Sequence, residues 1–180
     1  QSTRQSRPIW GALAAGLVLF AMGGLGGYAY KGAVTPVQTA GWLADIADYH
    51  AVYAGEVRHL VEVGADEADH IETRLGNTVG ARFDIPDLSS FGLTFQGGRL
   101  LVANAKPVAQ LMYRQADGAV VALCLQRSAT TANGAPEFKQ QEINGFEFVS
   151  WSANGANYVV IGTPDQANLG AVAKKAALEV

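Results

Sequence analysis

The sequence predicts an α+β protein, in which an N-terminal transmembrane helix precedes one domain with an antiparallel sheet of hairpins and flanking helices. Three observations predict this fold class. Residues 9–30 carry no charged side chain, segments with helical spacing stand near both ends of the remainder, and alternating segments joined by glycine-containing turns lie between them. Sequential hairpins give an antiparallel sheet, and we expect the helices to pack on one of its faces.

The apolar segment at residues 9–30 reads IWGALAAGLVLFAMGGLGGYAY. A helix needs roughly 20 apolar residues to cross a bilayer core, where no water can satisfy an irregular backbone. Arg4 and Arg7 precede the segment and only Lys31 follows it closely, which predicts a cytoplasmic N-terminus and an external domain. A cleaved signal peptide is the alternative, but its apolar region is usually shorter and a small-x-small cleavage site is lacking here.

The predicted organisation is a cytoplasmic juxtamembrane segment (1–8), a transmembrane helix (9–30), a connector (31–36) and a periplasmic, sensor-like α+β domain (37–180). Within the helix, Gly23 and Gly27 form a GxxxG pair, which favours a helix–helix contact, although glycine is also common in membrane helices for other reasons. The chain begins with Gln1 rather than Met, so we expect a fragment or a processed form.

Composition excludes some classes of function. The net charge of −3 and the pI of about 5.6 imply no basic surface for direct nucleic-acid binding. A single cysteine excludes an internal disulfide. Hydrophobic residues make up 49% of the chain, which is enough for a domain with its own core.

Three segments outside the apolar run have the spacing of an amphipathic helix. The first begins at Thr35-Pro36 and has its apolar face at Leu43, Ile46, His50, Tyr53 and Val57. The second begins at Asp66, has its apolar face at Ala68, Ile71 and Leu75, and stops at Gly76. The third begins at Thr163-Pro164 and has its apolar face at Leu169, Val172, Ala173 and Ala176.

The strand pattern starts with a short strand at residues 59–63, closed by Gly64. Three hairpins follow, with their turns at Gln96-Gly97-Gly98, Ala116-Asp117-Gly118 and Ala153-Asn154-Gly155. A polar loop is predicted over residues 128–136.

Candidate catalytic and metal-binding residues are few. His50, His59 and His70 lack the spacing of a zinc site, so no metal or other cofactor is predicted. Cys124 lies in an apolar run, where a free cysteine is commonly buried and inert. We therefore expect no enzyme activity; an anchored enzyme that uses Cys124 or a histidine is the rival hypothesis.

Aromatic residues gather in the last predicted hairpin, at Phe146, Phe148, Trp151 and Tyr158. Cross-strand aromatic pairs stabilise a sheet, and an exposed group of them would instead bind a partner. Alternation along the strands favours the structural interpretation.

Five ordered blocks resemble the extracytoplasmic part of proteobacterial membrane-anchored anti-sigma factors. They are Arg58-His59-Leu60-Val61-Glu62-Val63, Arg74-Leu75-Gly76, Ile85-Pro86-Asp87-Leu88 with Gly92-Leu93, Gly97-Gly98-Arg99-Leu100-Leu101, and Ala109-Gln110-Leu111-Met112-Tyr113. Arg7-Pro8-Ile9-Trp10 also resembles that family's entry into its membrane helix. Leu60 and Ile71 depart from the pattern, which has proline and tryptophan at these places.

The resemblance implies a single-pass inner-membrane regulator with a periplasmic sensory domain. Its partner would be an alternative, extracytoplasmic-function sigma factor, held by a cytoplasmic segment upstream of this chain, so no sigma-binding residue is assigned here. The same resemblance points to Arg58, His59, Glu62, Pro86 and Asp87 as the signalling or partner surface, against the plainer interpretation of a strand and a turn. The alternative function is a membrane-tethered periplasmic accessory module that docks on another envelope protein.

Overall fold

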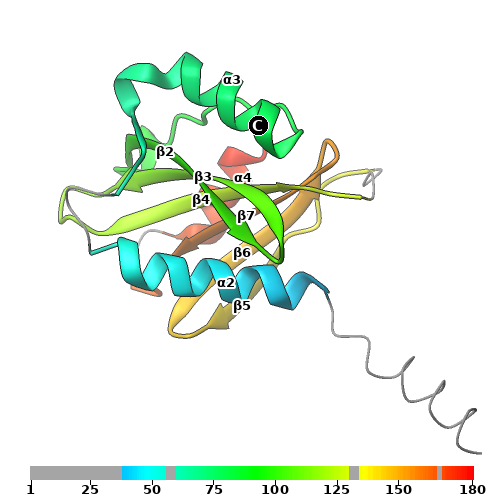
Figure 1. Cartoon of the computed structure of the whole chain (residues 1–180). Helices are drawn as coiled ribbons and strands as arrows, with labels where there is room; N and C mark the ends of the chain where they lie inside the picture. The colour runs from blue at the N-terminus through cyan, green and yellow to red at the C-terminus, as the bar shows by residue number, and fades with distance from the viewer. Residues whose placement is uncertain (1–37, 56–59, 130–133, 166–167) are drawn as a thin grey trace, which may run out of the picture. The chain divides into compact units, whose positions relative to one another are not determined.

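A seven-stranded antiparallel sheet forms the centre of the domain (Figure 1). The computed structural model describes residues 38–55, 60–129, 134–165 and 168–180, without the side chains of 38–40. The strand order is β1-β2-β3-β4-β7-β6-β5. The strands are β1 (Val63–Gly64), β2 (Thr94–Ala103), β3 (Lys106–Arg114), β4 (Val120–Arg127), β5 (Lys139–Ile143), β6 (Phe146–Ala153) and β7 (Ala156–Gly162).

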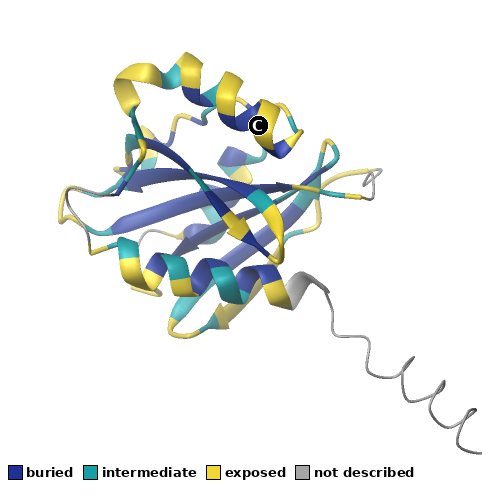
Figure 2. Cartoon of the chain, in the orientation of Figure 1, coloured by how far each residue is buried: buried dark blue, intermediate teal, exposed yellow. Residues whose placement is uncertain are grey.

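Helices cover both faces of this sheet, and the expectation that they pack on one face is wrong. Helix α2 (Gln38–Tyr53) buries Trp42, Leu43 and Ile46 in one hydrophobic cluster with the sheet. Helices α3 (Ala68–Val79) and α4 (Leu169–Ala176) belong to a second cluster that takes in the other side chains of the strands. Figure 2 shows the sheet dark blue between these helices, with exposed residues on their outer sides.

Strand β4 lies at the middle of the sheet and explains this arrangement. Every residue from Val120 to Gln126 is buried, because alternate side chains enter the two clusters. A continuous apolar run is typical of a strand that is covered on both faces. The apolar run at residues 120–125 is therefore the sequence pattern that indicates helices on both faces of the sheet.

Two of the three predicted hairpin turns are confirmed. β3 and β4 pair across residues 115–119, and β6 and β7 pair across Asn154-Gly155. The turn predicted at Gln96-Gly97-Gly98 is wrong, because these residues lie inside β2, where a β-bulge between Phe95 and Gly97 shifts the register. Gly97 has φ +136, a value that glycine readily adopts and that suits a bulge as well as a turn.

The true turn between β2 and β3 is at Asn104-Ala105, and both residues have positive φ. Such turns usually contain glycine, so the dipeptide Asn104-Ala105 is a weak turn signal. Strand β5 was also missed: it pairs with β6 across Asn144-Gly145, a turn that its dipeptide does favour.

Element boundaries differ from the predictions at several places. The first strand is only Val63–Gly64, and it continues into the 3₁₀ helix Ala65–Glu67 ahead of α3. Gly76 is not a stop, since α3 runs on to Val79 and is capped by Gly80 at φ +75. Helix α4 begins at Leu169 instead of Thr163-Pro164, because the Asn168 side chain accepts the Ala171 N–H and caps it.

The predicted apolar faces are mostly confirmed. Leu43, Ile46 and His50 are buried on α2, Ile71 and Leu75 on α3, and all four predicted positions on α4. The start at Thr35-Pro36 and the position Val57 lie outside the described residues. So do the apolar segment at 9–30 and its GxxxG pair; among the helices that the structure describes, none is long and apolar enough to cross a membrane.

Candidate functional site

Of the three candidates at Arg58, His59 and Glu62, the structure describes Glu62, which directly precedes β1. Arg58 and His59 lie outside the described residues. The Glu62 backbone N–H donates to the Gly98 carbonyl (3.1 Å), and its Oε2 atom accepts the Leu100 N–H (3.3 Å). Its carboxylate thus accepts an N–H of β2 beyond the N-terminal end of β1, where the backbone of a longer β1 would otherwise pair. Leu60, which departs from the family pattern, is buried in the cluster under α2.

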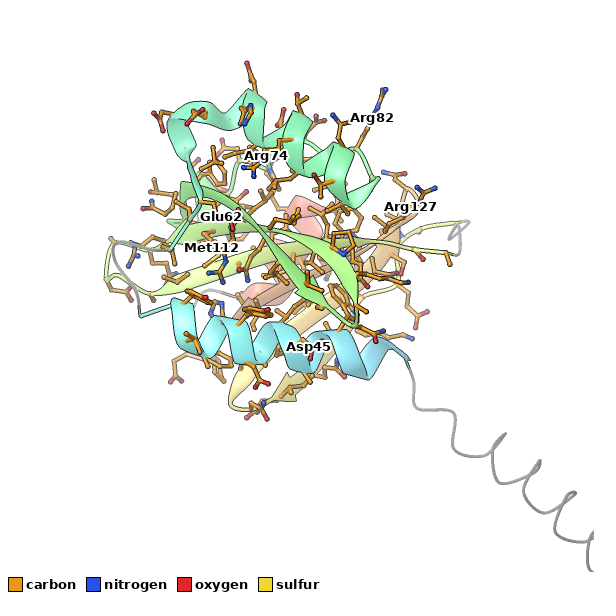
Figure 3. The ribbon with its side chains drawn as sticks, viewed as in Figure 1. Asp45, Glu62, Arg74, Arg82, Met112 and Arg127 are labelled. Atoms are coloured by element: carbon orange, nitrogen blue, oxygen red, sulfur yellow. The ribbon has the colours of Figure 1, made fainter. Side chains whose placement is uncertain are left out.

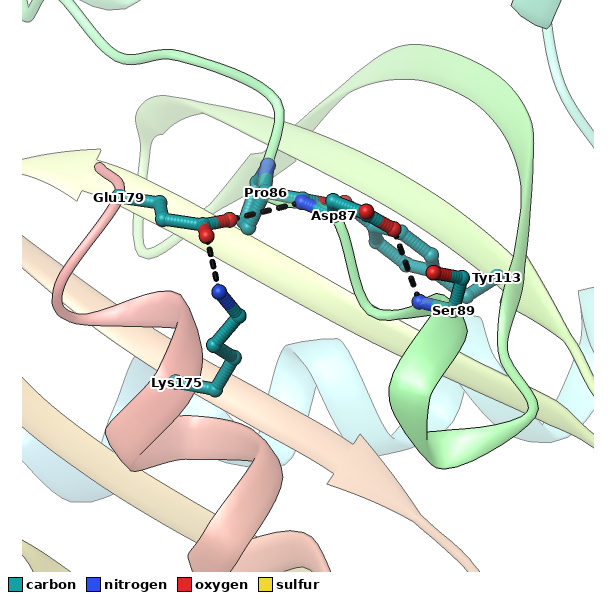
Figure 4. Close-up of polar contacts among 6 residues, drawn as sticks. All are labelled: Pro86, Asp87, Ser89, Tyr113, Lys175 and Glu179. Carbon is teal, nitrogen blue, oxygen red and sulfur yellow. Dashed lines mark hydrogen bonds and ion pairs between the residues drawn. The ribbon is translucent and has the colours of Figure 1, made fainter.

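The Pro86-Asp87 loop is fastened at two points (Figure 4). The Tyr113 hydroxyl, which is buried, donates to the Pro86 carbonyl (2.9 Å), and the Asp87 N–H donates to Glu179 Oε2 (2.8 Å). Glu179 is itself paired with Lys175 of α4. The loop therefore joins β3 to the C-terminal helix, and among the described residues it shares no hydrogen-bond partner with Glu62.

Electrostatics favours the ionised form of the loop's carboxylates. Hydrogen bonds from Ser89, chiefly the backbone N–H to Asp87 Oδ1 (3.0 Å), lower the pKa of Asp87. The hydrogen bond from Lys175 lowers the pKa of Glu179. Burial raises the pKa of Tyr113, so its hydroxyl stays a donor to Pro86. Asp87 is exposed, and its carboxylate presents a fixed negative charge at the surface.

A buried polar row crosses three strands beneath α2. The Arg99 Nε–H donates to Gln110 Oε1 (2.6 Å), and Gln110 Nε2 donates to Cys124 Sγ (3.4 Å). These residues are direct neighbours across β2, β3 and β4. The guanidinium carbon of Arg99 lies 4.1 Å from the ring centroid of Tyr53 on α2, a cation–π contact.

Sequence reasoning missed Arg99 as a site residue, although a signal was present. Arg99 shares a strand face with Leu101 and Ala103, so alternation alone directs this cation toward the core. It is only 5% exposed. A buried charge is costly unless paired, and in the described residues no carboxylate forms an ion pair with Arg99.

Helix α2 is packed on this row with several polar atoms unsatisfied. Trp42 Nε1, His50 Nδ1 and Arg99 Nη2 are buried and have no hydrogen-bond partner among the described residues. Burial, together with the Arg99 charge, lowers the pKa of His50 to about 4, so the ring is neutral at neutral pH. Each unsatisfied buried group reduces the free energy that docking α2 gains.

Two aspartates fasten α2 to hairpin turns at its outer side. Asp45 Oδ2 accepts the Asn104 backbone N–H of the β2–β3 turn (2.7 Å), and Asp48 Oδ1 accepts from Asn144 Nδ2 of the β5–β6 turn (3.3 Å). Figure 3 shows Asp45 on the helix that crosses the sheet. We call this arrangement the α2 clamp: the Asp45–Asn104 and Asp48–Asn144 contacts.

The rival catalytic residues that the structure describes, Cys124, His50 and His70, are not assembled into one site. Cys124 is fully buried, and burial raises the pKa of its thiol to about 12, which disfavours the nucleophilic thiolate. His50 is buried on the inner side of α2, and His70 is exposed on α3. In the described part of the chain, no group of three or more His, Cys, Asp or Glu residues could hold a metal ion.

The aromatic hairpin is part of the core. Phe148, Trp151 and Tyr158 are buried, and the last two rings stack with centroids 5.2 Å apart. Phe146 is half-buried and meets the edge of His50 at 5.0 Å. These side chains stabilise the sheet and its helices and do not form an exposed patch.

Comparison with protein-family models, curated proteins and solved structures found no match to this chain.

Proposed function

We propose that this chain is the anchor and extracytoplasmic sensory part of a membrane-anchored anti-sigma factor. One observation supports the proposal: the described residues of the five resemblance blocks lie on elements that contact one another. Gly97 and Gly98 pair with β1, Gly98 faces Ile71 and Leu75 of α3, and Tyr113 of β3 holds Pro86. If this chain shares the fold of that family, the blocks of the family pattern should lie on elements that contact one another.

The proposed action is that of a tether with two states. Residues 9–30 hold the protein in the inner membrane, a cytoplasmic segment sequesters an extracytoplasmic-function sigma factor, and the periplasmic domain receives a signal. No nucleic acid, cofactor or catalysis is required of this chain. A signal shifts the two states only if it binds them with different free energies.

Helix α2 is the physical link in this proposal. It is the first described helix after the predicted membrane segment and connector, and it is fastened by the α2 clamp over unsatisfied buried groups. An interface of this kind has a smaller docking free energy than an apolar one. The two states of the domain would therefore differ in whether α2 is docked on the sheet or released from it. This difference would be transmitted to the membrane helix.

The decisive test is affinity capture of the intact gene product from membranes, with its N-terminal segment present. A co-purifying sigma factor is the expected result. A stoichiometric envelope complex without a sigma factor would overturn the proposal in favour of the accessory module.

A second test addresses α2. Asp45→Ala removes the acceptor for Asn104 and should change sigma-dependent reporter transcription in the absence of any signal. Asp69→Ala, an exposed aspartate on α3, is the matched control and should leave the reporter unchanged. Equal reporter output from wild type and Asp45→Ala would remove α2 from the mechanism.

A further inference from the structure

A cavity of about 300 Å³ opens where α3 ends beside the start of β3 and the end of β4. Its lining consists of Val79, Lys106, Pro107, Gln126, Arg127, Ser128 and Ala129. The volume is at the small end of the range for ligand pockets, which selects a small molecule. None of the residues described above as signalling candidates belongs to it.

The described residues of the lining carry two positive charges and no acidic group. In the described ranges neither Lys106 nor Arg127 forms an ion pair. Val79 and Pro107 supply apolar surface beside these cations. A site of this composition fits a small carboxylate with an apolar body, because a carboxylate accepts two parallel hydrogen bonds from an arginine.

Arg127 is exposed and lies against the turn that ends α3. An ideal Cβ on Gly80 would lie 3.0 Å from Arg127 Nη1 and 3.4 Å from its Cδ, so the absence of a side chain at Gly80 lets the arginine lie against this turn. Figure 3 shows Arg127 beside the C-terminal end of α3.

The cavity wall is also connected to the α2 clamp through one peptide group. Gln126 is 4% exposed, and its Nε2 donates to the Ala103 carbonyl (3.0 Å). The N–H of the same peptide unit belongs to Asn104 and donates to Asp45 on α2. A primary amide has a second N–H to donate, so a ligand that binds it would restrain this peptide from the cavity side.

We propose that this cavity binds a small amphipathic carboxylate and that occupancy strengthens the docking of α2 through Gln126, the Ala103–Asn104 peptide and Asp45. The proposal that the cavity binds a ligand depends on the cavity only. The role of this ligand as the sensed signal rests on the proposed function. The ligand pairs its carboxylate with Arg127 and Lys106 and places its apolar body on Val79 and Pro107.

The binding test uses the full chain in lipid nanodiscs and sodium hexanoate as the probe, with empty nanodiscs as the blank. Hexanoate should saturate, and the neutral hexanamide should bind about tenfold more weakly, as should Arg127→Gln, because each lacks a charge-assisted pair. Arg74→Gln, an exposed arginine on α3 outside the lining, should match wild type. Equal binding of hexanoate and hexanamide, or of Arg127→Gln and wild type, would overturn the site.

The coupling test measures amide hydrogen exchange in the same samples. Hexanoate should slow exchange in α2 and leave α4 unchanged, and Gln126→Met should abolish the effect on α2. Should Gln126→Met not fold, Asp45→Ala breaks the same connection from the helix side. Saturable binding with equal effects on α2 and α4 would overturn the coupling. If hexanoate binds but no sigma factor co-purifies, the proposed function is refuted and the ligand site stands. If a sigma factor co-purifies but hexanoate does not bind, the ligand site is refuted and the proposed function stands.

Discussion

Gly97→Ala should be among the most damaging single substitutions in the domain. A Cβ at residue 97 would lie 2.1 Å from the Val63 carbonyl oxygen, and the backbone already has φ +136. The strain of that conformation costs about 1–2 kcal/mol for a residue with a Cβ. The clash also drives β1 from β2, which breaks the two hydrogen bonds of Glu62, each worth about 1 kcal/mol. We therefore expect a loss of about 3–4 kcal/mol in the free energy of unfolding.

Gly92→Ala is the matched control, because Gly92 also has positive φ (+72) but faces open space. It should cost only the backbone strain of about 1–2 kcal/mol. Urea unfolding of the full chain in detergent micelles, followed by tryptophan fluorescence, measures both variants, since Trp42 and Trp151 are buried. Equal losses for the two variants would refute the assignment of the clash at β1.

Three further outcomes follow from buried groups. Tyr113→Phe should lower the free energy of unfolding by about 1–3 kcal/mol in the same urea assay, because it leaves the Pro86 carbonyl without its donor; a loss below that range would mean that water replaces the hydroxyl. The pKa of His50 is about 4 when folded and about 6.5 when unfolded, so stability should be constant above pH 6.5 and fall by up to about 3 kcal/mol as the pH drops to 4. His50→Gln should flatten that part of the pH–stability curve, whereas an unchanged curve would exclude this histidine. Cys124 should resist thiol reagents in the native state and react only after unfolding, and rapid native labelling would contradict its burial.

Much of the fold was predictable because local signals and packing agree. The face of α4 at Leu169, Val172, Ala173 and Ala176 followed from spacing alone, and each of these residues is buried. The turn at Asn154-Gly155 followed from its dipeptide. The assignment of Gln96-Gly97-Gly98 to a turn failed because a glycine at positive φ also serves a bulge, and only pairing with β1 and β3 distinguishes the two.

The candidate site was less predictable, because it depends on long-range contacts. Asp87 was proposed by resemblance, but nothing in its neighbourhood in the sequence indicates that Glu179 would accept its N–H. Arg99 was overlooked although alternation placed it inward. The cavity beside Arg127 lies between parts of α3, β3 and β4 that are distant in sequence. No periodic pattern in the sequence predicts that these parts lie together.

The strand order has a consequence for how the chain folds. Along β1 to β4, and again along β5 to β7, every strand pairs with its neighbour in sequence, and a single seam between β4 and β7 joins the two groups. The four hairpin pairings, β2–β3, β3–β4, β5–β6 and β6–β7, close small loops and form fast, whereas the seam and the β1–β2 pairing must wait for longer closures. α3 packs on the first group and α4 on the second. The domain is therefore suited to division into two fragments, cut between β4 and β5, that would meet along the β4–β7 strand pair, in the two hydrophobic clusters and at the Asp48–Asn144 and Asp87–Glu179 contacts.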